Sequence, residues 1–421
     1  MTEYRRIDSY SLIALVCFGL LLSCQDLSQK RARFEELEPP LAESSMQPYL
    51  FWEGEELYMT WTEVNGQGEP RLVMSSFSHG SWGERTEVAK GSDWFVNWAD
   101  FPGFSKSGNS MITHFLKKSD TATFAYDVQY LHSSDSGLNW SGPSKLHSDS
   151  IKAEHGFVSF SPAGNDSFLS VWLDGRNTSG DGRENSGLTH EAHGGPGAMQ
   201  LRSGLIDASG RVHGEQLIDD RTCDCCQTSL AVTSSGILVA YRDRSEQEIR
   251  DIYISLLQEG SWSTPKPVYS DNWKIAGCPV NGPKLASMGN SACLAWFTAA
   301  RDQPQVKIAF SDDGGLNFDP PIRIDDGMPM GRVDAAMLDR NTALVSWMET
   351  IPGGAQIRLA TVDRTSGEVS SLQVADVPGG RSTGFPQLEV GNKQIFLAWN
   401  VSGETGKRIR SVRFDLEQIY P

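Results

Sequence analysis

The densest group of chemically capable side chains lies between Asp219 and Ser255, where the chain reads DDRTCDCCQTSLAVTSSGILVAYRDRSEQEIRDIYIS. Three cysteines occupy the four positions from Cys223 to Cys226, and an apolar stretch then leads to alternating arginines and carboxylates. Thiols pair as disulfides or bind soft metal ions, and guanidinium groups bind carboxylates. One segment therefore combines thiol chemistry with the means to bind an anion.

The cysteines Cys223, Cys225 and Cys226 have a fourth candidate partner in Cys278. Two disulfides among these four residues are one interpretation, because an exported protein meets an oxidising compartment. A metal ion such as copper or zinc at the cysteine cluster is a second interpretation, since clustered thiolates suit soft ions. Free or partly paired thiols are the third. Beyond this possible metal ion, the cofactors are unknown from the sequence.

Four arginines follow apolar stretches in three successive parts of the chain: Arg176, Arg242, Arg244 and Arg301. A planar guanidinium binds a carboxylate through two hydrogen bonds, which makes these residues candidates for capturing an anionic ligand. The alternative is that they form structural ion pairs with neighbouring carboxylates.

The elements that position these groups follow from an internal repeat. A phrase with a turn, an apolar strand and a closing aromatic recurs as ELYMTW, SMITHF, SFLSVW, GILVAY, SACLAW, TALVSW and QIFLAW. Spacings of roughly 50 to 70 residues are typical of four-stranded propeller blades. We therefore predict an all-β fold, a β-propeller of four-stranded antiparallel blades. Seven units are counted, and a six-bladed ring with one irregular unit is the alternative. Closure requires a strand from the N-terminal side, within residues 48–52 or upstream.

Two turns carry a family resemblance. Residues 133–140 (SSDSGLNW) and 311–318 (SDDGGLNF) both match Ser-x-Asp-x-Gly-x-x-aromatic. The pattern resembles the Asp box, or BNR repeat, of sialidase-like propellers, with weaker copies at Trp82 and Trp262. In such a turn Asp accepts backbone N–H groups and Gly adopts positive φ. The resemblance implies a fold, and the Asp box itself lies away from catalysis.

The same resemblance implies roles for individual residues. Sialidases use a tyrosine nucleophile with a glutamate, an aspartic acid as acid/base, and an arginine trio that holds a carboxylate. The candidate catalytic residues here are Asp100, Glu154, Asp174, Tyr241 and Asp243. Tyr241 has the alternative of being buried packing. The Arg-Ile-Pro motif of sialidases is not found near the first repeat, which reads QPYLFWEG.

The unusual residues are predicted to share one face of the ring. The Asp box connects the third and fourth strands of a blade, so the second-to-third loops and the blade-to-blade loops emerge on the opposite face. The candidates above lie in these loops, except Tyr241, which ends the strand GILVAY. Trp94 and Trp98 lie there too, where they either stack on sugar rings or fill space between blades.

The N-terminus predicts export. Arg5 and Arg6 precede an apolar run, residues 11–22, that is too short to span a bilayer stably. The run ends in LLSC, which resembles a bacterial lipobox with Cys24 as the lipidated residue; an ordinary cleaved signal is the alternative. The predicted organisation is a signal peptide at 1–23, a polar tether at 24–47 and a propeller at 48–421. The predicted location is the bacterial cell envelope, lipid-anchored, at the outer membrane.

The net charge of -16 argues against a nucleic-acid partner, and membrane contact is expected through the lipid anchor alone. We expect a monomer that binds a glycan or another carboxylate-bearing ligand. The leading interpretation is an exo-glycosidase of the exo-α-sialidase type acting on anionic glycans. The alternatives are a non-catalytic glycan- or protein-binding propeller, a polysaccharide lyase, and a metal or redox role at the cysteine cluster.

Overall fold

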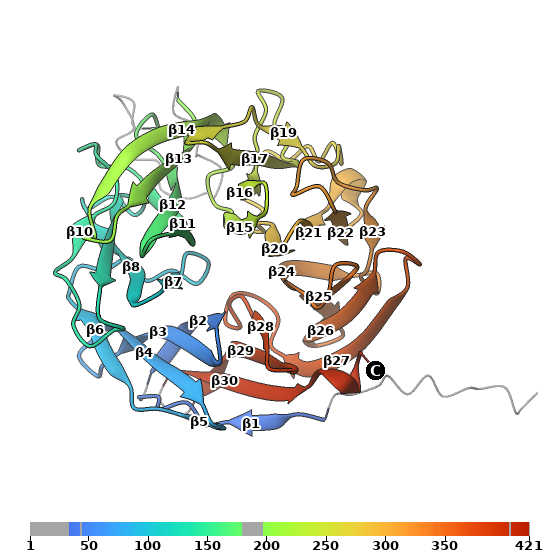
Figure 1. Cartoon of the computed structure of the whole chain (residues 1–421), viewed down its shortest axis with the longest axis horizontal. Helices are drawn as coiled ribbons and strands as arrows, with labels where there is room; N and C mark the ends of the chain where they lie inside the picture. The colour runs from blue at the N-terminus through green and yellow to red at the C-terminus, as the bar shows by residue number, and fades with distance from the viewer. Residues whose placement is uncertain (1–32, 43, 179–196, 404–405, 421) are drawn as a thin grey trace, which may run out of the picture.

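The computed structural model describes residues 33–42, 44–178, 197–403 and 406–420. The strands of these residues form seven antiparallel sheets arranged as the blades of a ring around a central opening (Figure 1). The predicted all-β propeller with seven units is therefore confirmed. Cys24 and the signal peptide lie outside the described residues.

Each blade begins with an inner strand at the central opening and proceeds outward. The first three blades contain β2 (Ser45–Glu53), β3 (Glu56–Val64), β4 (Pro70–Ser78), β5 (Ser81–Trp82) and β6 (Thr86–Lys90); β7 (Phe104–Ser107), β8 (Ser110–Lys118), β9 (Tyr126–Ser133) and β10 (Ser144–Lys145); and β11 (His155–Gly164), β12 (Ser167–Asp174), β13 (Met199–Ile206) and β14 (Val212–Thr222).

The fourth to sixth blades follow the same plan. They contain β15 (Ser229–Thr233), β16 (Gly236–Arg242), β17 (Ile252–Gln258), β18 (Ser261–Trp262) and β19 (Lys266–Pro267); β20 (Lys284–Met288), β21 (Ser291–Thr298), β22 (Gln305–Ser311) and β23 (Ile322–Arg323); and β24 (Pro329–Met337), β25 (Thr342–Ile351), β26 (Gly354–Asp363) and β27 (Val369–Val377). None of the helices in the described ranges is long and apolar enough to cross a membrane.

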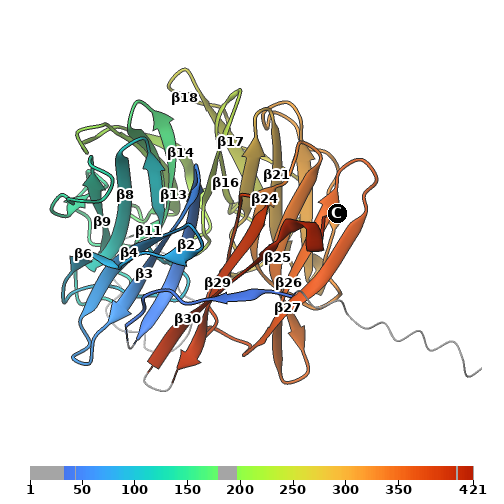
Figure 2. The same cartoon turned by 60° about the horizontal axis from the view of Figure 1, so that its bottom comes forward.

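The last blade closes the ring with strands from both ends of the chain. It contains β28 (Gln387–Gly391), β29 (Gln394–Gly403) and β30 (Gly406–Asp415), and its outer strand is β1 (Glu35–Leu37). Figures 1 and 2 both show β1 beside β30. The predicted tether boundary at residue 48 is thus too late, because residues 35–37 and the start of β2 belong to the propeller. The closing strand comes from upstream, one of the two positions expected.

The closing aromatics of the repeat are the core of each blade. All seven lie on the second strand and are at most 5% exposed: Trp61, Phe115, Trp172, Tyr241, Trp296, Trp347 and Trp399. Successive residues of a strand face opposite sides, so a large ring at this position packs between neighbouring blades. The indole N–H is often satisfied locally: Trp172 donates to Asp174 at 2.8 Å and Trp347 to Glu349 at 2.7 Å.

The two Asp boxes have the predicted turn geometry. Oδ1 of Asp135 accepts the backbone N–H of Asn139 at 2.9 Å, and Gly137 has a φ of 82°. Asp313 accepts the N–H of Asn317 in the same way, at 2.9 Å. The turns connect β9 to β10 and β22 to β23, the third and fourth strands of their blades. They mark one face of the ring, and the inner strands begin at the other.

Candidate functional site

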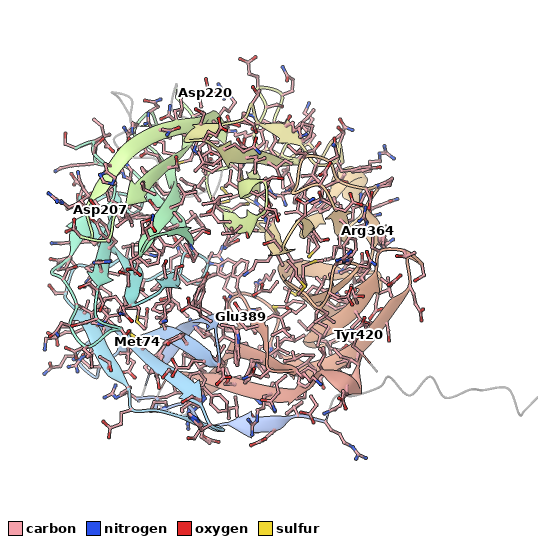
Figure 3. All side chains as sticks on the ribbon, in the orientation of Figure 1. Met74, Asp207, Asp220, Arg364, Glu389 and Tyr420 are labelled. Atoms are coloured by element: carbon pink, nitrogen blue, oxygen red, sulfur yellow. The ribbon has the colours of Figure 1, made fainter. Side chains whose placement is uncertain are left out.

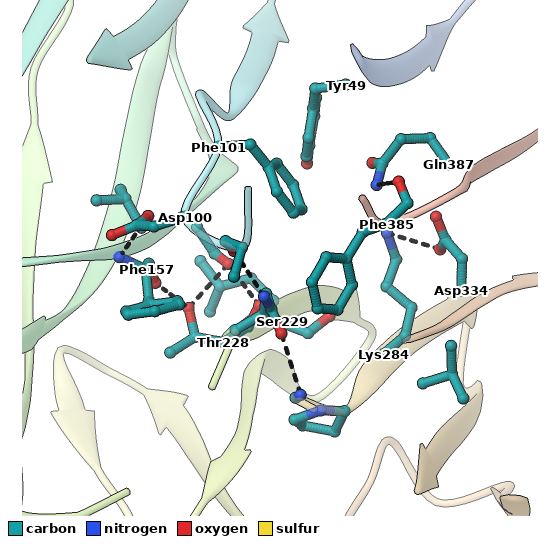
Figure 4. A pocket seen from close by; sticks show the side chains of 18 of the residues that line it. Tyr49, Asp100, Phe101, Phe157, Thr228, Ser229, Lys284, Asp334, Phe385 and Gln387 are labelled. Atoms are coloured by element: carbon teal, nitrogen blue, oxygen red, sulfur yellow. Dashed lines mark hydrogen bonds and ion pairs between the residues drawn. The ribbon is translucent and has the colours of Figure 1, made fainter. Parts of the chain in front are cut away.

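A pocket lies in the middle of the ring, at the ends where the inner strands begin. It has an empty volume of about 760 Å³, part of it open to solvent. Its walls come from the inner strands and from the loops that lead into them, on the face opposite the Asp boxes, as predicted. The side chains labelled in Figure 4 are Tyr49, Asp100, Phe101, Phe157, Thr228, Ser229, Lys284, Asp334, Phe385 and Gln387.

Aromatic rings form part of the pocket wall. Phe101 lies between Tyr49 and Phe385, with ring centroids 6.3 and 5.8 Å away. Figure 4 shows the hydroxyl of Tyr49 directed toward the interior of the pocket. Flat apolar surfaces beside polar groups such as Gln387 and Ser229 suit a sugar ring, which has apolar faces and hydroxyl edges. The lining of the pocket is thus of the kind that suits a carbohydrate unit.

Asp100 is the predicted acid that reaches this pocket. It is 3% exposed, and its Oδ1 accepts the backbone N–H of Phe157 at 2.9 Å. Its Oδ2 is buried without a hydrogen-bond partner. Burial raises the pKa of Asp100 to about 7, because the charged carboxylate loses its water, and the Phe157 hydrogen bond offsets only part of this effect. A carboxyl that keeps its proton near neutral pH can act as a general acid.

Lys284 and Asp334 form another part of the pocket wall, and Glu389 lies near them outside the lining. Nζ of Lys284 lies 2.9 Å from Oδ1 of Asp334, whose Oδ2 accepts the N–H of Leu388 at 2.9 Å. Glu389 lies beside the central opening (Figure 3), and burial raises its pKa to about 8 despite the opposing charge of Lys284. The pKa of Lys284 is raised, because Asp334 and its other acidic neighbours outweigh desolvation. Lys284 is the one basic side chain among the described pocket-lining residues.

Glu154 pairs with a tyrosine that sequence reasoning missed. The hydroxyl of Tyr126 donates to Oε1 of Glu154 at 2.7 Å, next to Asp100. Burial, followed by the charge of Glu154, raises the pKa of Tyr126 well above its usual range. A hydrogen-bonded Tyr–Glu pair beside an aspartic acid is the set of residue types that the resemblance implied. Tyr126 is 1% exposed and its ring stacks on Phe95 at 4.3 Å, so the pair lies behind the pocket wall.

The structure does not bring the predicted arginines together. Arg242 is 2% exposed and donates to the backbone carbonyls of Asn281, Arg250 and Phe297 at 2.6 to 3.0 Å. Its guanidinium also lies 4.8 Å from the Trp273 ring centroid. Arg242 therefore stabilises the junction between blades, and the predicted ligand role is wrong for this residue.

Two of the other three arginines form ion pairs outside the pocket, and the third is exposed on a loop. Arg176 pairs with Asp174 at 2.7 Å and with Glu215 at 2.8 Å. Arg244 pairs with Glu248 at 2.7 Å, and Arg301 is exposed in the loop between β21 and β22. None of the four lines the central pocket. The structural ion-pair alternative describes Arg176 and Arg244, because loop carboxylates lie within reach of each guanidinium.

Three predicted catalytic residues lie away from the pocket. Tyr241 is 1% exposed and donates to Asp219 within a hydrophobic cluster, which is the packing alternative. Asp174 is buried and bound by Arg176, which holds its pKa at about 2 against the effect of burial. Burial and the nearby Asp219 raise the pKa of Asp243 to about 7, but Asp243 does not line the pocket.

The two predicted tryptophans serve as packing. Trp94 stacks on Phe115 with centroids 4.0 Å apart. Trp98 stacks on Phe385 at 5.6 Å, behind the pocket wall, and the guanidinium of Arg332 lies 4.8 Å from its ring centroid. Trp98 therefore supports a pocket residue and does not line the pocket itself.

The cysteine cluster is formed as predicted in space. The sulfur atoms of Cys223, Cys225 and Cys226 all lie within 4.8 Å of one another, and Cys278 contributes to the environment of Cys225. The Sγ atoms of Cys223 and Cys226 are 3.5 Å apart, longer than a disulfide bond of about 2.05 Å. Nη1 of Arg250 lies 3.1 Å from Sγ of Cys223. The cysteines of the described residues form no disulfide. The choice among disulfides, a metal ion and free or partly paired thiols stays a prediction.

The missed pocket residues share a sequence position that could have revealed them. In five blades the residue twelve positions before the closing aromatic lines the pocket; for example, Tyr49 precedes Trp61 and Lys284 precedes Trp296. The register explains the offset, since Lys284 pairs with Ala295, directly before the aromatic. The five residues are Tyr49, Phe160, Ser229, Lys284 and Gln387.

No protein-family model matches the sequence, and no curated protein matches it. Solved structures do match. The polysaccharide lyase Uly1 has a TM-score of 0.52 at 9% identity over 90% of this chain and 92% of its own. A mutant of the α-L-arabinofuranosidase Arb93A from Fusarium graminearum, in complex with an iminosugar inhibitor, has a TM-score of 0.51 at 12% identity over 93% of this chain and 99% of its own.

An endosialidase of phage phi92 is also similar, with a TM-score of 0.49 at 8% identity over 91% of this chain and 69% of its own. At such low identities the likeness concerns the fold alone. The chain is thus a seven-bladed β-propeller structurally similar to propeller glycosidases and to a polysaccharide lyase.

Proposed function

We propose that this protein is a glycoside hydrolase that holds a terminal sugar in the central pocket and cleaves its glycosidic bond with Asp100 as general acid. The observation that carries the proposal is the state of Asp100. It lines the pocket, it has one oxygen without a partner, and its pKa is raised to about 7. Protonation of the departing oxygen requires such a carboxyl.

Lys284 is the group in the pocket wall that suits an acidic sugar. Lys284 is paired with Asp334 at 2.9 Å, and a substrate carboxylate can share its remaining donors. For the exo-sialidase form of the proposal, the support is the Tyr126–Glu154 pair, which matches the residue types of the sialidase set and lies behind the pocket wall next to Asp100. No arginine lies among the described residues of the pocket wall, so a sialic acid or uronate would be held by Lys284 and by neutral polar groups.

A polysaccharide lyase is the second candidate, and one observation favours it. The hydroxyl of Tyr49 points into the pocket near Lys284; burial raises the pKa of Tyr49, and the charge of Lys284 opposes this effect. A lyase needs a base to remove the proton beside a uronate carboxylate and a cation to neutralise that carboxylate. Tyr49 and Lys284 are the matching residue types.

One experiment separates the candidates. The signal-free chain is assayed against fluorogenic sialosides, uronides and arabinofuranosides, and against uronate polysaccharides with detection of the unsaturated product. The hydrolase proposal expects fluorogenic turnover that falls about 100-fold or more in Asp100→Asn. Asp302→Asn is the matched control, because Asp302 is exposed and its positive φ of 57° suits asparagine.

Each result of this assay has a defined meaning. Unsaturated product that is lost in Tyr49→Phe and retained in Asp100→Asn would replace the hydrolase by the lyase. Glycan binding without turnover on any substrate would refute both and favour the binding propeller. Turnover that is equal in wild type and Asp100→Asn would remove Asp100 from the mechanism.

We also propose that the enzyme acts at the bacterial outer membrane through a lipid on Cys24. The support is the order of features in residues 5–24, where two arginines precede an apolar run that ends in LLSC. In a bacterial host, the full chain should incorporate a labelled fatty acid and sediment with membranes, and Cys24→Ala should lose the label. Unchanged labelling of Cys24→Ala would reject the anchor at this residue.

A further inference from the structure

Three thiols meet in the loop between the third and fourth blades, next to the pocket but outside its lining. The loop connects β14 to β15 and turns at Asp224 and Cys225. The Sγ atoms of Cys223, Cys225 and Cys226 all lie within 4.8 Å of one another, and those of Cys223 and Cys226 are 3.5 Å apart. One short turn thus gathers three ligand atoms, and all three are sulfur.

Cys278 brings a fourth thiol from the next inter-blade loop, between β19 and β20. Its side chain interacts with that of Cys225. Cys225 and Cys278 are partly exposed, whereas Cys223 and Cys226 are buried. Two thiols are therefore fixed in the interior, and the other two leave an ion a path into the group.

The spacing of the sulfur atoms suits one metal ion at their centre. Zinc binds thiolate sulfur at about 2.3 Å, so two sulfurs of a tetrahedral site are about 3.8 Å apart, and two sulfurs of a flat three-coordinate site about 4.0 Å. The observed separations run from 3.5 Å for Cys223 and Cys226 to at most 4.8 Å within the group. Because a thiolate sulfur carries three lone pairs around its C–S bond, sulfurs at these separations can share one ion.

Two donors from other segments point at the sulfurs and favour their thiolate form. Nη1 of Arg250 lies 3.1 Å from Sγ of Cys223, and the backbone N–H of Asn281 donates to Sγ of Cys226 at 3.4 Å. The side chain of Arg250 is only 3% exposed. Its carboxylate partner among the described ion pairs, Glu248, is shared with a second arginine. A negative charge on sulfur beside this buried guanidinium stabilises both groups.

Disulfides do not supply this negative charge. Pairing of Cys223 with Cys226, and of Cys225 with Cys278, would make every sulfur neutral, so Arg250 would face a neutral disulfide. Four hydrogen-bonded thiols would be neutral as well. A metal ion instead keeps its sulfur ligands ionised, and hydrogen bonds to the sulfurs are a usual feature of thiolate-bound metal centres.

We propose that Cys223, Cys225 and Cys226 bind one soft metal ion, zinc or copper(I), as thiolates, with Cys278 supplying the fourth sulfur of a tetrahedral site. Clustered thiolates select such ions over harder ones. Each thiol gives its proton to solvent when it binds, so uptake of the ion releases protons.

The ion would join two inter-blade loops that continue into the pocket wall. Gln227 follows the cysteines and lines the pocket, and its Oε1 accepts the backbone N–H of Gly282, another lining residue, at 3.1 Å. Asn281, whose N–H donates to Cys226, directly precedes Gly282. Loss of the ion should therefore loosen this part of the wall together with the cluster.

The test measures metal without any substrate, so its result does not depend on the proposed hydrolase. Residues 25–421, which lack the predicted signal and Cys24, are exported to the periplasm of a bacterial host supplied with zinc and copper. One ion per chain is expected, and all five cysteines of this chain should react as thiols after unfolding in chelator without reductant. Cys225→Ala should lose the ion. Cys293→Ala is the matched control and should keep it, because Cys293 is buried in a different hydrophobic cluster.

Two further measurements identify the ligands and the ion. Cobalt in the reduced wild-type chain should give sulfur-to-cobalt charge-transfer bands, which tests the site even where Cys225→Ala fails to fold. In competition with chelators, Cys278→Ala should weaken zinc binding at least about 10-fold, whereas copper(I) held by three thiolates should be affected less.

Four results would overturn the proposal. They are two disulfides in the exported chain, no metal uptake by the reduced and folded chain, cobalt bands of nitrogen and oxygen ligands alone, and equal metal content in wild type and Cys225→Ala.

Discussion

Replacing Asp100 by asparagine tests the central group of the proposed mechanism through stability as well as activity. The difference between a pKa of about 7 and the ordinary value of 3.8 corresponds to about 4 kcal/mol of differential stability. Because Asp100 is only 3% exposed, solvent screens little of this electrostatic free energy. The folded carboxyl holds its proton more tightly than the unfolded one. Its favourable contribution is therefore complete below about pH 4 and is lost as the pH rises toward 7.

An asparagine side chain cannot ionise, so Asp100→Asn should escape this loss. The substitution can leave a buried amide N–H unsatisfied, which costs about 1 to 3 kcal/mol, but that cost is the same at every pH. The free energy of unfolding of the variant minus that of the wild type should therefore rise by about 4 kcal/mol between pH 4 and pH 8. Wild-type activity should fall above about pH 7 as Asp100 loses its proton.

Parallel thermal and urea unfolding of wild type, Asp100→Asn and the control Asp302→Asn at several pH values measures the difference. Coincidence of two spectroscopic probes checks that the propeller unfolds in one step. A difference that stays flat from pH 4 to pH 8 would mean that Asp100 is ionised in the folded protein at neutral pH. That result would remove the general acid from the proposal, whatever the activity of the variant.

Three further predictions concern other parts of the structure. Arg242→Met should lower the free energy of unfolding by about 3 to 6 kcal/mol, because three buried carbonyls lose their donor; a thermal midpoint equal to that of wild type would contradict this structural role. If the substrate is acidic, Lys284→Met should raise its KM at least about 10-fold, while Lys284→Arg should retain most of the binding. Equal losses on neutral and acidic substrates would count against recognition of the substrate charge by Lys284. A chain that begins at residue 38 should be less stable to heat and protease than one that begins at residue 33, because it lacks the strand Glu35–Leu37 that pairs with β30; equal protease resistance would show that this strand is dispensable.

The sequence by itself determined the fold because the signals for it are local. A closing aromatic such as Trp172 needs only its own strand to be placed between blades, and Asp135 needs only the four residues after it to form its turn. Because neighbouring strands of a blade run in opposite directions, placing the Asp-box turns on one face also assigns every other loop to a face. The face that carries the site could therefore be predicted. For this reason the sequence predicted that Asp100 and the cysteine cluster lie on this face, while their roles stay predictions.

Only the tertiary structure decided which polar residues are free to meet a ligand. Arg242 and Lys284 are both basic residues at the ends of strands. Arg242 donates to carbonyls of two loops and of β21, whereas Lys284 lines the pocket. His147 and His155 stack in the connection between β10 and β11, where the chain passes from one blade to the next, and no motif in the sequence indicates this contact. Ring closure by Glu35–Leu37 is likewise a contact between residues nearly four hundred positions apart. Hydrogen-bond partners and burial across blades determine these roles, and neither is encoded in a local pattern.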